Sequence, residues 1–252
     1  PESTDLSLEH QITKTGETMF GNIKNASGEN LDYTFHDGDT SSQKIVVLGH
    51  GVTGNKDRPF LVELAKNLSQ SGIPTLRFSS SGNGDSDGEF TQSTISTEIG
   101  NLASVLDVLE NHTVCYIGHS MGGAVGVLSA SQDDRIKLLV SLAGMVETKA
   151  FAQREFGDVT PDEGFMWDEP SCPLSQAYMD DLAKIDTVVD YASKISVPWL
   201  LVHGSEDDVV PIEDSQKIYA QANEPKELFT IEDANHVFSD DSLDFMVEKV
   251  VN

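Results

Sequence analysis

The pentapeptide Gly118-His119-Ser120-Met121-Gly122 is the segment of this sequence with the clearest chemical meaning. It has the pattern G-x-S-x-G, in which a tight turn between a strand and a helix can expose a serine hydroxyl. The apolar run Thr113–Ile117 precedes Ser120, and a stretch of mostly small residues, 122–130, follows it. We therefore predict that Ser120 is a nucleophile.

The same pattern occurs a second time, in Gly84-Asp85-Ser86-Asp87-Gly88. An isolated match to this pattern is weak evidence, so the context has to separate the two copies. Ser86 lies in a polar stretch between two carboxylates, which would oppose the loss of its proton. We interpret Ser86 as a surface-turn residue.

A serine nucleophile needs a base, and the chain has seven histidines. We predict that His236 is the base, because it follows the last predicted strand. His119 is adjacent to the serine, and its side chain should point away from the hydroxyl. His50 and His203 each end an apolar run before a glycine, and we interpret both as hydrogen-bonding framework. The remaining three histidines are expected to face solvent: His10, His36 and His112.

The base in turn needs an orienting acid. The acidic run Glu206-Asp207-Asp208 follows the penultimate predicted strand. We choose Asp207, and the residues alone leave Glu206 and Asp208 open. The order Ser120, Asp207, His236 along the chain is the order expected for an α/β-hydrolase.

Four separate blocks, spread over nearly the whole chain, resemble the α/β-hydrolase superfamily. They are His50–Gly54, the turn at Ser120, the H-G-x-x-D-x-x-V-P pattern of residues 203–211, and Asn235-His236. Residues 50–59, with an insertion after the sixth core strand, are most similar to the cinnamoyl/feruloyl esterase-type carboxylesterases.

The resemblance implies an enzyme without cofactor or metal. It also implies an oxyanion hole formed by the backbone N–H groups of Val52 and Met121. Two fixed donors of this kind stabilise the oxyanion of a tetrahedral intermediate by roughly 3–4 kcal/mol each in comparable sites.

The surrounding pattern predicts the elements that must position these residues. Strands are predicted at Lys44–Gly49, Ile73–Phe78, Thr113–Gly118, Ile136–Ala143, Pro198–His203 and Glu227–Ile231. Helices are predicted at Arg58–Gln70, Thr94–Leu109, Met121–Ala130, Ile212–Ala222 and Ser242–Val250. Apolar strands that alternate with helices indicate a parallel sheet covered on both faces. We expect an α/β-hydrolase fold with a mostly parallel, eight-stranded sheet, and a hairpin of Thr18–Lys24 and Leu31–His36 at one edge.

Residues 145–196 interrupt the alternation, since they contain no convincing strand. Long excursions of this kind tend to be functional. We predict that residues 145–196 form a small helical cap over the carboxyl ends of the strands, and that residues 1–144 and 197–252 form the core. Candidate substrate-binding residues in the cap are Phe151, Phe165, Met166 and Trp167. Packing of the cap onto the core is the open alternative for each of them.

Composition sets limits on the class of protein. The 252 residues are 38% hydrophobic, which suits one large folded domain. The net charge of −26 would repel phosphate backbones, so nucleic acid is excluded as an expected partner. No apolar run is long enough to span a membrane, and residues 1–30 carry no secretory signal pattern, which predicts a cytoplasmic protein. Two cysteines make neither a disulfide framework nor a zinc site.

These observations predict a serine carboxylesterase acting on small to medium esters through an acyl-enzyme. Its partner would be a small-molecule ester, and the sequence does not indicate an oligomeric state. A lysophospholipase, a monoacylglycerol lipase and a peptidase use the same chemistry and remain open. A non-catalytic binding protein on the same fold is the alternative from another class.

Overall fold

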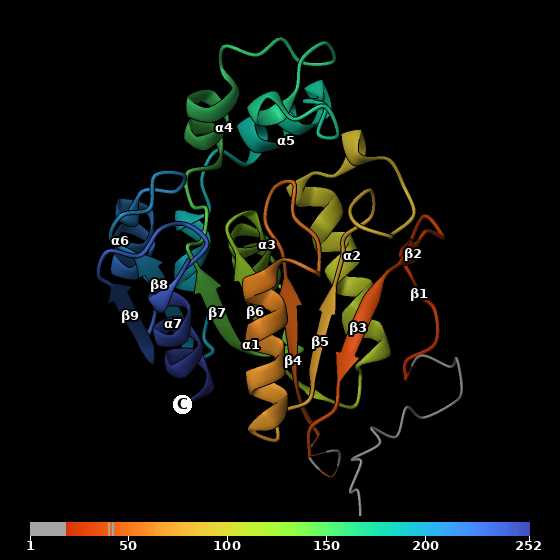
Figure 1. Ribbon diagram of the computed structural model, residues 1–252, viewed down its shortest axis with the longest axis vertical. Coiled ribbons are helices and arrows are strands. Elements are labelled where there is room, and N and C mark those ends of the chain that lie inside the picture. The colour runs from red at the N-terminus through yellow and green to blue at the C-terminus, as the bar shows by residue number, and fades with distance from the viewer. Residues whose placement is uncertain (1–18, 40, 42) are drawn as a thin grey trace, which may run out of the picture.

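The computed structural model describes residues 19–39, 41 and 43–252, and its centre is a sheet of seven strands (Figure 1). The strands are β3 (Tyr33–His36), β4 (Lys44–Gly49), β5 (Thr75–Phe78), β6 (Thr113–His119), β7 (Ile136–Leu142), β8 (Trp199–Gly204) and β9 (Lys226–Ile231). Their order is β3-β5-β4-β6-β7-β8-β9, and only β3 runs antiparallel to its neighbour. The six strands β4 to β9 lie within two residues of their predicted bounds.

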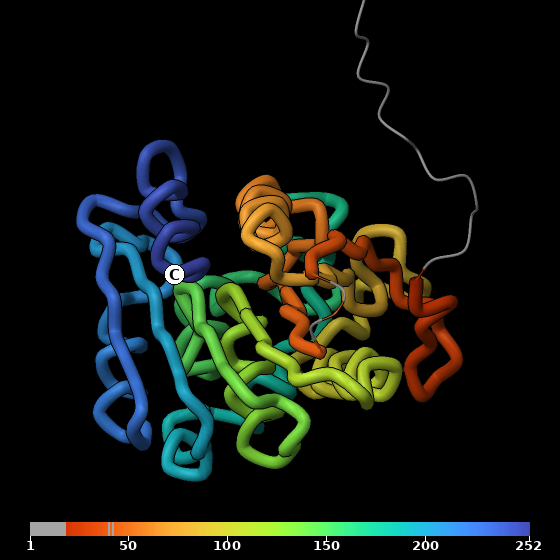
Figure 2. Tube along the Cα trace, turned by 90° about the horizontal axis from the view of Figure 1, so that it is seen from below, coloured from red at the N-terminus to blue at the C-terminus, as the bar shows by residue number. Residues whose placement is uncertain are grey.

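Helices cover both faces of this sheet. They are α1 (Pro59–Gln70) and α7 (Asp241–Val251) on one face, with α2 (Ile95–Val108), α3 (Met121–Ala130) and α6 (Ile212–Gln221) on the other (Figure 2). Successive side chains of a strand point to opposite faces. Accordingly, Ile45 and Val47 belong to the α2/α3 side of the core, whereas Val46 and Leu48 belong to the α1/α7 side. This two-sided burial explains why the inner strands β4, β6, β7 and β8 are mostly apolar.

Two expectations about the sheet are wrong. Within the residues that the structure describes, the main sheet has seven strands and not eight, and no hairpin lies at its edge. Two short strands, β1 (Ile23–Lys24) and β2 (Asn30–Leu31), pair only with each other, and β3 alone joins the main sheet. The break falls at Asp32, whose N–H donates to Ser86 Oγ and whose carbonyl accepts from the Ser79 N–H. These bonds tie the chain to the loop after β5 and prevent a continuous hairpin. Thr18, the predicted start, lies outside the described residues.

Most of residues 145–196 lie beyond the carboxyl ends of the strands. They hold α4 (Thr148–Phe156), α5 (Gln176–Ile185) and two short 3₁₀ helices, Met166–Asp168 and Val189–Lys194. Figure 1 shows α4 and α5 above the tips of the strands. The second 3₁₀ helix packs against α6 and α3, so the segment returns to the sheet before β8 begins. Among the helices that the structure describes, none is long and apolar enough to cross a membrane.

Candidate active site

Ser120 occupies a strained turn between β6 and α3. Its φ of 54° and ψ of −118° lie in a region that a non-glycine residue rarely adopts. Its N–H donates to the Leu142 carbonyl at 3.0 Å, and its own carbonyl accepts from the N–H groups of Gly123 and Met145 at 2.8 and 2.9 Å. These bonds, made to the ends of two neighbouring elements, hold the serine in this conformation.

The residues around this turn must be small for steric reasons. A Cβ atom on Gly118 would collide with the Gly122 carbonyl oxygen. A Cβ atom on Gly51 would lie 2.7 Å from Ser120 Cβ. The glycines of the G-x-S-x-G pattern and of the His-Gly pair after β4 are therefore required for the same reason. Each lies where the backbone approaches another part of the chain closely beside the serine.

The structure brings His236 and Asp207 together. His236 Nδ1 lies 2.8 Å from Asp207 Oδ2, and the carboxylate side chain is fully buried. Its other oxygen, Oδ1, accepts from the N–H groups of Val209 and Val210, each at 2.9 Å. Burial alone would raise the pKa of Asp207, but the hydrogen bonds from His203 and His236 outweigh it and hold that pKa well below the ordinary value. Asp207 is therefore a carboxylate at neutral pH.

The other two acids of the run point away from this contact. Glu206 and Asp208 are exposed, and neither forms a hydrogen bond with His236. Of the three acids that the sequence leaves open, the structure places only Asp207 against the imidazole.

Ser120 and His236 line the same cavity, which has a volume of about 310 Å³. The other side chains that shape it are mostly apolar: Val52, Phe60, Trp167, Val209 and Val237. Arg58 also lines the cavity and carries its only formal charge, since no carboxylate occurs among the described lining residues. The chain has 42 acidic residues, so the absence of a carboxylate from the described lining distinguishes this cavity from the acidic surface of the protein.

Two backbone N–H groups beside the serine are unused. Val52 lines the cavity, and Met121 is the first residue of α3, where an N–H has no partner within the helix. Within the part of the chain that the structure describes, no residue accepts a hydrogen bond from either N–H.

His119 and His50 support the loops around the site. Burial, together with the nearby His236, lowers the pKa of His119 to about 3, and burial lowers the pKa of His50 to about 4. Both rings are neutral at pH 7. His50 Nδ1 donates to the Gly51 carbonyl at 2.9 Å, while its Nε2 accepts from the Ser80 N–H at 3.0 Å. These bonds fix the loop after β4 against the loop after β5.

Two of the remaining histidines differ from expectation. His36 is half-buried and its Nε2 accepts a hydrogen bond from Arg77 Nε at 2.8 Å, because the antiparallel pairing of β3 with β5 brings the two together. His112 is also half-buried, with its ring 6.0 Å from that of Phe20. His10 lies outside the described residues.

Trp167 is the one predicted cap residue that the structure places in the cavity wall. Its φ is 49°, its indole N–H donates to Glu155 Oε2 at 3.1 Å, and its ring packs edge-on against Phe156. The other three do not line the cavity. Phe151 and Met166 are buried among the residues of segment 145–196, where Phe151 packs against Phe156. The side chain of Phe165 is exposed to solvent outside the cavity.

Sequence reasoning missed several residues of the cavity. Arg58 and Phe60 follow the His-Gly pair after β4, Val209 lies two residues after the acid, and Val237 directly follows the base. Their closeness in sequence to those residues is the signal that could have identified them.

Ser86 has the structural role that its context indicates. Its hydroxyl donates to the Ser79 carbonyl at 2.8 Å and accepts from the Asp32 N–H at 2.8 Å. Both hydrogen-bonding functions serve the turn, and Ser86 is not among the residues that line the cavity.

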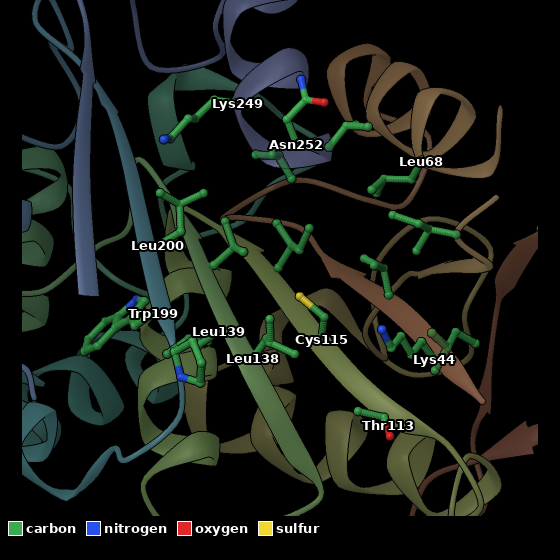
Figure 3. A pocket seen from close by; sticks show the side chains of 18 of the residues that line it. Lys44, Leu68, Thr113, Cys115, Leu138, Leu139, Trp199, Leu200, Lys249 and Asn252 are labelled. Atoms are coloured by element: carbon green, nitrogen blue, oxygen red, sulfur yellow. The ribbon is translucent and has the colours of Figure 1, made fainter. Parts of the chain in front are cut away.

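A larger cavity, of about 690 Å³, lies at the opposite, amino-terminal end of the sheet (Figure 3). Its described lining contains neither histidine nor serine, and burial raises the pKa of its cysteine, Cys115, to about 12. It therefore holds no activated nucleophile. No cluster of three or more potential metal-ligating side chains occurs in residues 19–39, 41 and 43–252.

The mostly parallel sheet, the strained serine after β6 and the acid and histidine after β8 and β9 define the α/β-hydrolase class. The protein is a serine hydrolase of that superfamily. The model of the prolyl oligopeptidase family matches residues 101–248, more than half of the chain, which therefore belongs to this family. The model described as serine aminopeptidase, S33, matches residues 40–160.

Individual proteins and solved structures are also similar to this chain. The uncharacterized protein YfhR of Escherichia coli O157:H7 is 27% identical over 216 residues, which cover 82% of this chain and 68% of YfhR. The structure of Est1E from Butyrivibrio proteoclasticus with bound ferulic acid has a TM-score of 0.81 and 27% identity, over 91% of this chain and 96% of Est1E. A monoacylglycerol lipase from Paleococcus ferrophilus has a TM-score of 0.68 over 88% of this chain and 98% of the lipase, and at 20% identity it supports the fold alone.

Proposed function

We propose that this protein is a serine carboxylesterase that hydrolyses small to medium esters through an acyl-enzyme. One observation carries the proposal. Ser120 and His236 line the same cavity, and Nδ1 of His236 is hydrogen-bonded to the buried side chain of Asp207. A nucleophile, a base and an orienting acid thus meet at one place.

The chemistry follows from this arrangement. Because His236 Nδ1 donates to Asp207, Nε2 is the nitrogen that can accept a proton. Ser120 Oγ attacks the ester carbonyl carbon and His236 takes the serine proton. The resulting imidazolium then gives this proton to the departing alkoxide, which leaves as the alcohol. A water molecule, deprotonated in the same way, attacks the acyl-serine and releases the carboxylic acid.

Two groups would stabilise the charges that form. Asp207, with its lowered pKa, remains anionic and stabilises the imidazolium. The N–H groups of Val52 and Met121 would donate to the oxyanion of each tetrahedral intermediate.

The cavity favours a compact, partly apolar substrate. Its volume of about 310 Å³ lies near the lower end of the usual range for small-molecule sites. Phe60 and Trp167 offer aromatic surfaces, which suit an aromatic or short aliphatic group. The ferulic acid bound to Est1E supports the acid of an aromatic ester as one such group.

A peptidase is the second candidate, because the two family models are named for peptidases. An aminopeptidase has to bind the ammonium group of its substrate, for which a carboxylate is the natural partner. The described lining of the cavity contains no carboxylate, and Arg58 would repel an ammonium group. This charge pattern favours an ester over the substrate of an aminopeptidase.

A substrate panel with the serine variant as control tests the proposal. It contains p-nitrophenyl esters of increasing chain length, methyl ferulate, a monoacylglycerol, a lysophospholipid and an aminoacyl p-nitroanilide. We expect the highest kcat/KM for the short and aromatic esters, and no turnover of these by Ser120→Ala. A preference for the lipids would favour a lipase, and a Ser120-dependent preference for the anilide would favour the peptidase.

A further inference from the structure

His203 is a fully buried histidine near the end of β8, and its ring touches the carboxylate that the proposed mechanism uses. Its Nε2 lies 2.9 Å from the Val210 carbonyl oxygen and 3.2 Å from Asp207 Oδ2. Its Nδ1 lies 2.7 Å from Ser215 Oγ, on α6. Because both partners of Nε2 are acceptors, we assign the ring proton to Nε2, and Nδ1 then accepts from the Ser215 hydroxyl.

Asp207 therefore has two imidazole rings on a single oxygen atom. Oδ2 lies 2.8 Å from His236 Nδ1 and 3.2 Å from His203 Nε2. The peptide of Val210 links the same groups, since its N–H donates to Asp207 Oδ1 and its carbonyl faces His203. The ring of His203 thus holds both the carboxylate and the loop that carries it.

We propose that His203 is a positioning residue that orients Asp207 and, by sharing Oδ2, limits how strongly this carboxylate stabilises the protonated form of His236. The inference rests on the proposed function. The Nε2–H of His203, which also faces the Val210 carbonyl, lies 3.2 Å from Oδ2, and its positive end stabilises the carboxylate and withdraws electron density from that oxygen. The negative charge on Oδ2 then attracts the His236 proton less strongly. His236 therefore releases its proton at a lower pH than it would if His203 did not contact Oδ2.

The plain alternative is that His203 only fills space and ties the loop through Val210. A packing role predicts lower stability and a uniform loss of activity at every pH. A shared oxygen predicts, in addition, that the pH dependence moves. The other titratable or charged groups near this pair are His119 on β6 and Arg58 in the cavity wall, while the flanking Glu206 and Asp208 are exposed. None of these four side chains forms a hydrogen bond or an ion pair with Asp207 Oδ2.

Three variants separate these roles: His203→Leu, His203→Gln and Ser215→Ala. Leucine removes both contacts of Nε2, whereas glutamine keeps an amide N–H that can reach Asp207. Ser215→Ala keeps the ring but removes the hydroxyl bonded to Nδ1, which loosens the ring and weakens the contact of its Nε2–H with Asp207 Oδ2. The kinetic readout is kcat and KM for p-nitrophenyl butyrate from about pH 5 to 9, with thermal unfolding measured alongside.

A second readout needs no substrate. The proton between His236 Nδ1 and Asp207 should give a low-field ¹H NMR resonance, which is identified by its absence in His236→Gln. Following this resonance with pH reports on the base even if no ester is turned over. Failure of the proposed function, seen as wild-type protein without esterase activity, is therefore distinct from failure of this inference.

For His203→Leu we expect the rising limb of the pH–rate profile to move up by roughly one pH unit, with the NMR transition moving in the same direction. We also expect kcat to fall about tenfold to a hundredfold with little change in KM, because a misplaced acid affects the reaction more than binding. His203→Gln should restore most of both quantities, and Ser215→Ala should move the midpoint in the same direction by less.

Two results would overturn the inference. One is a folded His203→Leu protein whose midpoint and NMR transition equal those of the wild type. The other is an equal loss in the Leu and Gln variants at every pH, which would leave only the packing role. If His203→Leu does not fold, Ser215→Ala decides, because an unmoved resonance in that variant contradicts the sharing of Oδ2.

Discussion

The His119 Nε2 atom donates to the backbone carbonyl of His236 at 2.9 Å, and the two imidazole rings lie 4.7 Å apart. The residue that precedes the serine thus holds the loop that carries the proposed base. This contact couples the turn after β6 to the loop after β9, which are more than a hundred residues apart in the chain. Burial lowers the pKa of His119 to about 3, so at pH 7 the ring is neutral and its single proton lies on Nε2.

The neutrality of His119 and His50 predicts a loss of stability in acid. The unfolded chain binds a proton at each histidine below a pKa of about 6.5, whereas the folded protein does so only near 3 and 4. Between these values the unfolded state carries more protons, so the free energy of unfolding falls as the pH falls, by up to about 1.4 kcal/mol per pH unit for each ring.

Chemical denaturation at several pH values between 4 and 7 measures this slope. The variant His119→Gln keeps an N–H for the His236 carbonyl but cannot titrate in this range. It should therefore show a shallower pH dependence than the wild type. Identical slopes for the two proteins would mean that His119 is not held neutral by the fold.

Replacing Ser120 with alanine should abolish esterase activity while the fold is kept, because only the hydroxyl attacks the carbonyl carbon. A fluorophosphonate probe should label the wild type at Ser120. Ser86→Ala is the matched control, since Ser86 sits in the second G-x-S-x-G segment and uses its hydroxyl in a turn. It should keep both activity and labelling. Labelling recovered at Ser86 would contradict the assignment of the nucleophile.

Asp207→Asn should cost far more rate than Asp208→Asn. Asp207 is the buried partner of His236 Nδ1, whereas Asp208 is exposed. The corresponding substitution in another serine hydrolase lowers kcat by about 10⁴, and we expect a loss approaching that size here. Asp208→Asn should stay within about threefold of the wild type, as is usual for an exposed position. Equal losses in the two variants would show that the acid has been misassigned.

Much of this site could be predicted from the sequence because each of its parts lies in the loop that follows a strand of the sheet. Ser120 comes directly after β6, and Asp207 and His236 lie in the loops after β8 and β9. The strands β6 and β8 are mostly buried and apolar, which makes their ends easy to locate, whereas β9 is a half-exposed edge strand. The choice among the three adjacent acids needed the structure, since it depends on which backbone N–H groups surround the carboxylate.

The cap was harder to predict for a physical reason. Phe151 and Trp167 are both aromatic residues in a segment without clear periodicity, and their roles depend on contacts made only after folding. Phe151 packs against Phe156 inside the cap, while the positive φ of Trp167 turns its ring toward the cavity wall. Neither outcome can be derived from residue type or spacing.

Trp167 should affect substrate choice, with Phe165 as its matched control. Both side chains are more than 40% exposed, at 44% and 41%, but only Trp167 lines the cavity. Trp167→Ala should change kcat/KM unequally across p-nitrophenyl esters of different chain length, with a small change in Tm. Phe165→Ala should change neither. A uniform loss for all esters in Trp167→Ala, together with a lower Tm, would assign Trp167 to packing.

Glu98 should give a pH dependence of the opposite sign. This carboxyl group on α2 is almost fully buried, and burial raises its pKa to about 8 from an ordinary value of 4.5. Hydrogen bonds from Ser93, at 3.4 Å, and from Ser80 offset this rise only in part. Between pH 4.5 and 8 the unfolded chain has lost a proton that the folded protein keeps. The unfolded state then carries fewer protons, so the free energy of unfolding falls as the pH rises through this range.

Glu98→Gln should remove this dependence, because a neutral amide of similar shape replaces a carboxyl group that resists ionisation. We expect the variant to match the wild type near pH 5 and to exceed it by about 1–3 kcal/mol at pH 8. Denaturant unfolding at these two pH values gives the comparison. Glu89→Gln is the control, since Glu89 is exposed and should behave like the wild type at both. If Glu98→Gln is less stable than the wild type at pH 8, the Glu98 carboxyl group is ionised in the folded protein and stabilised by partners that the amide cannot replace.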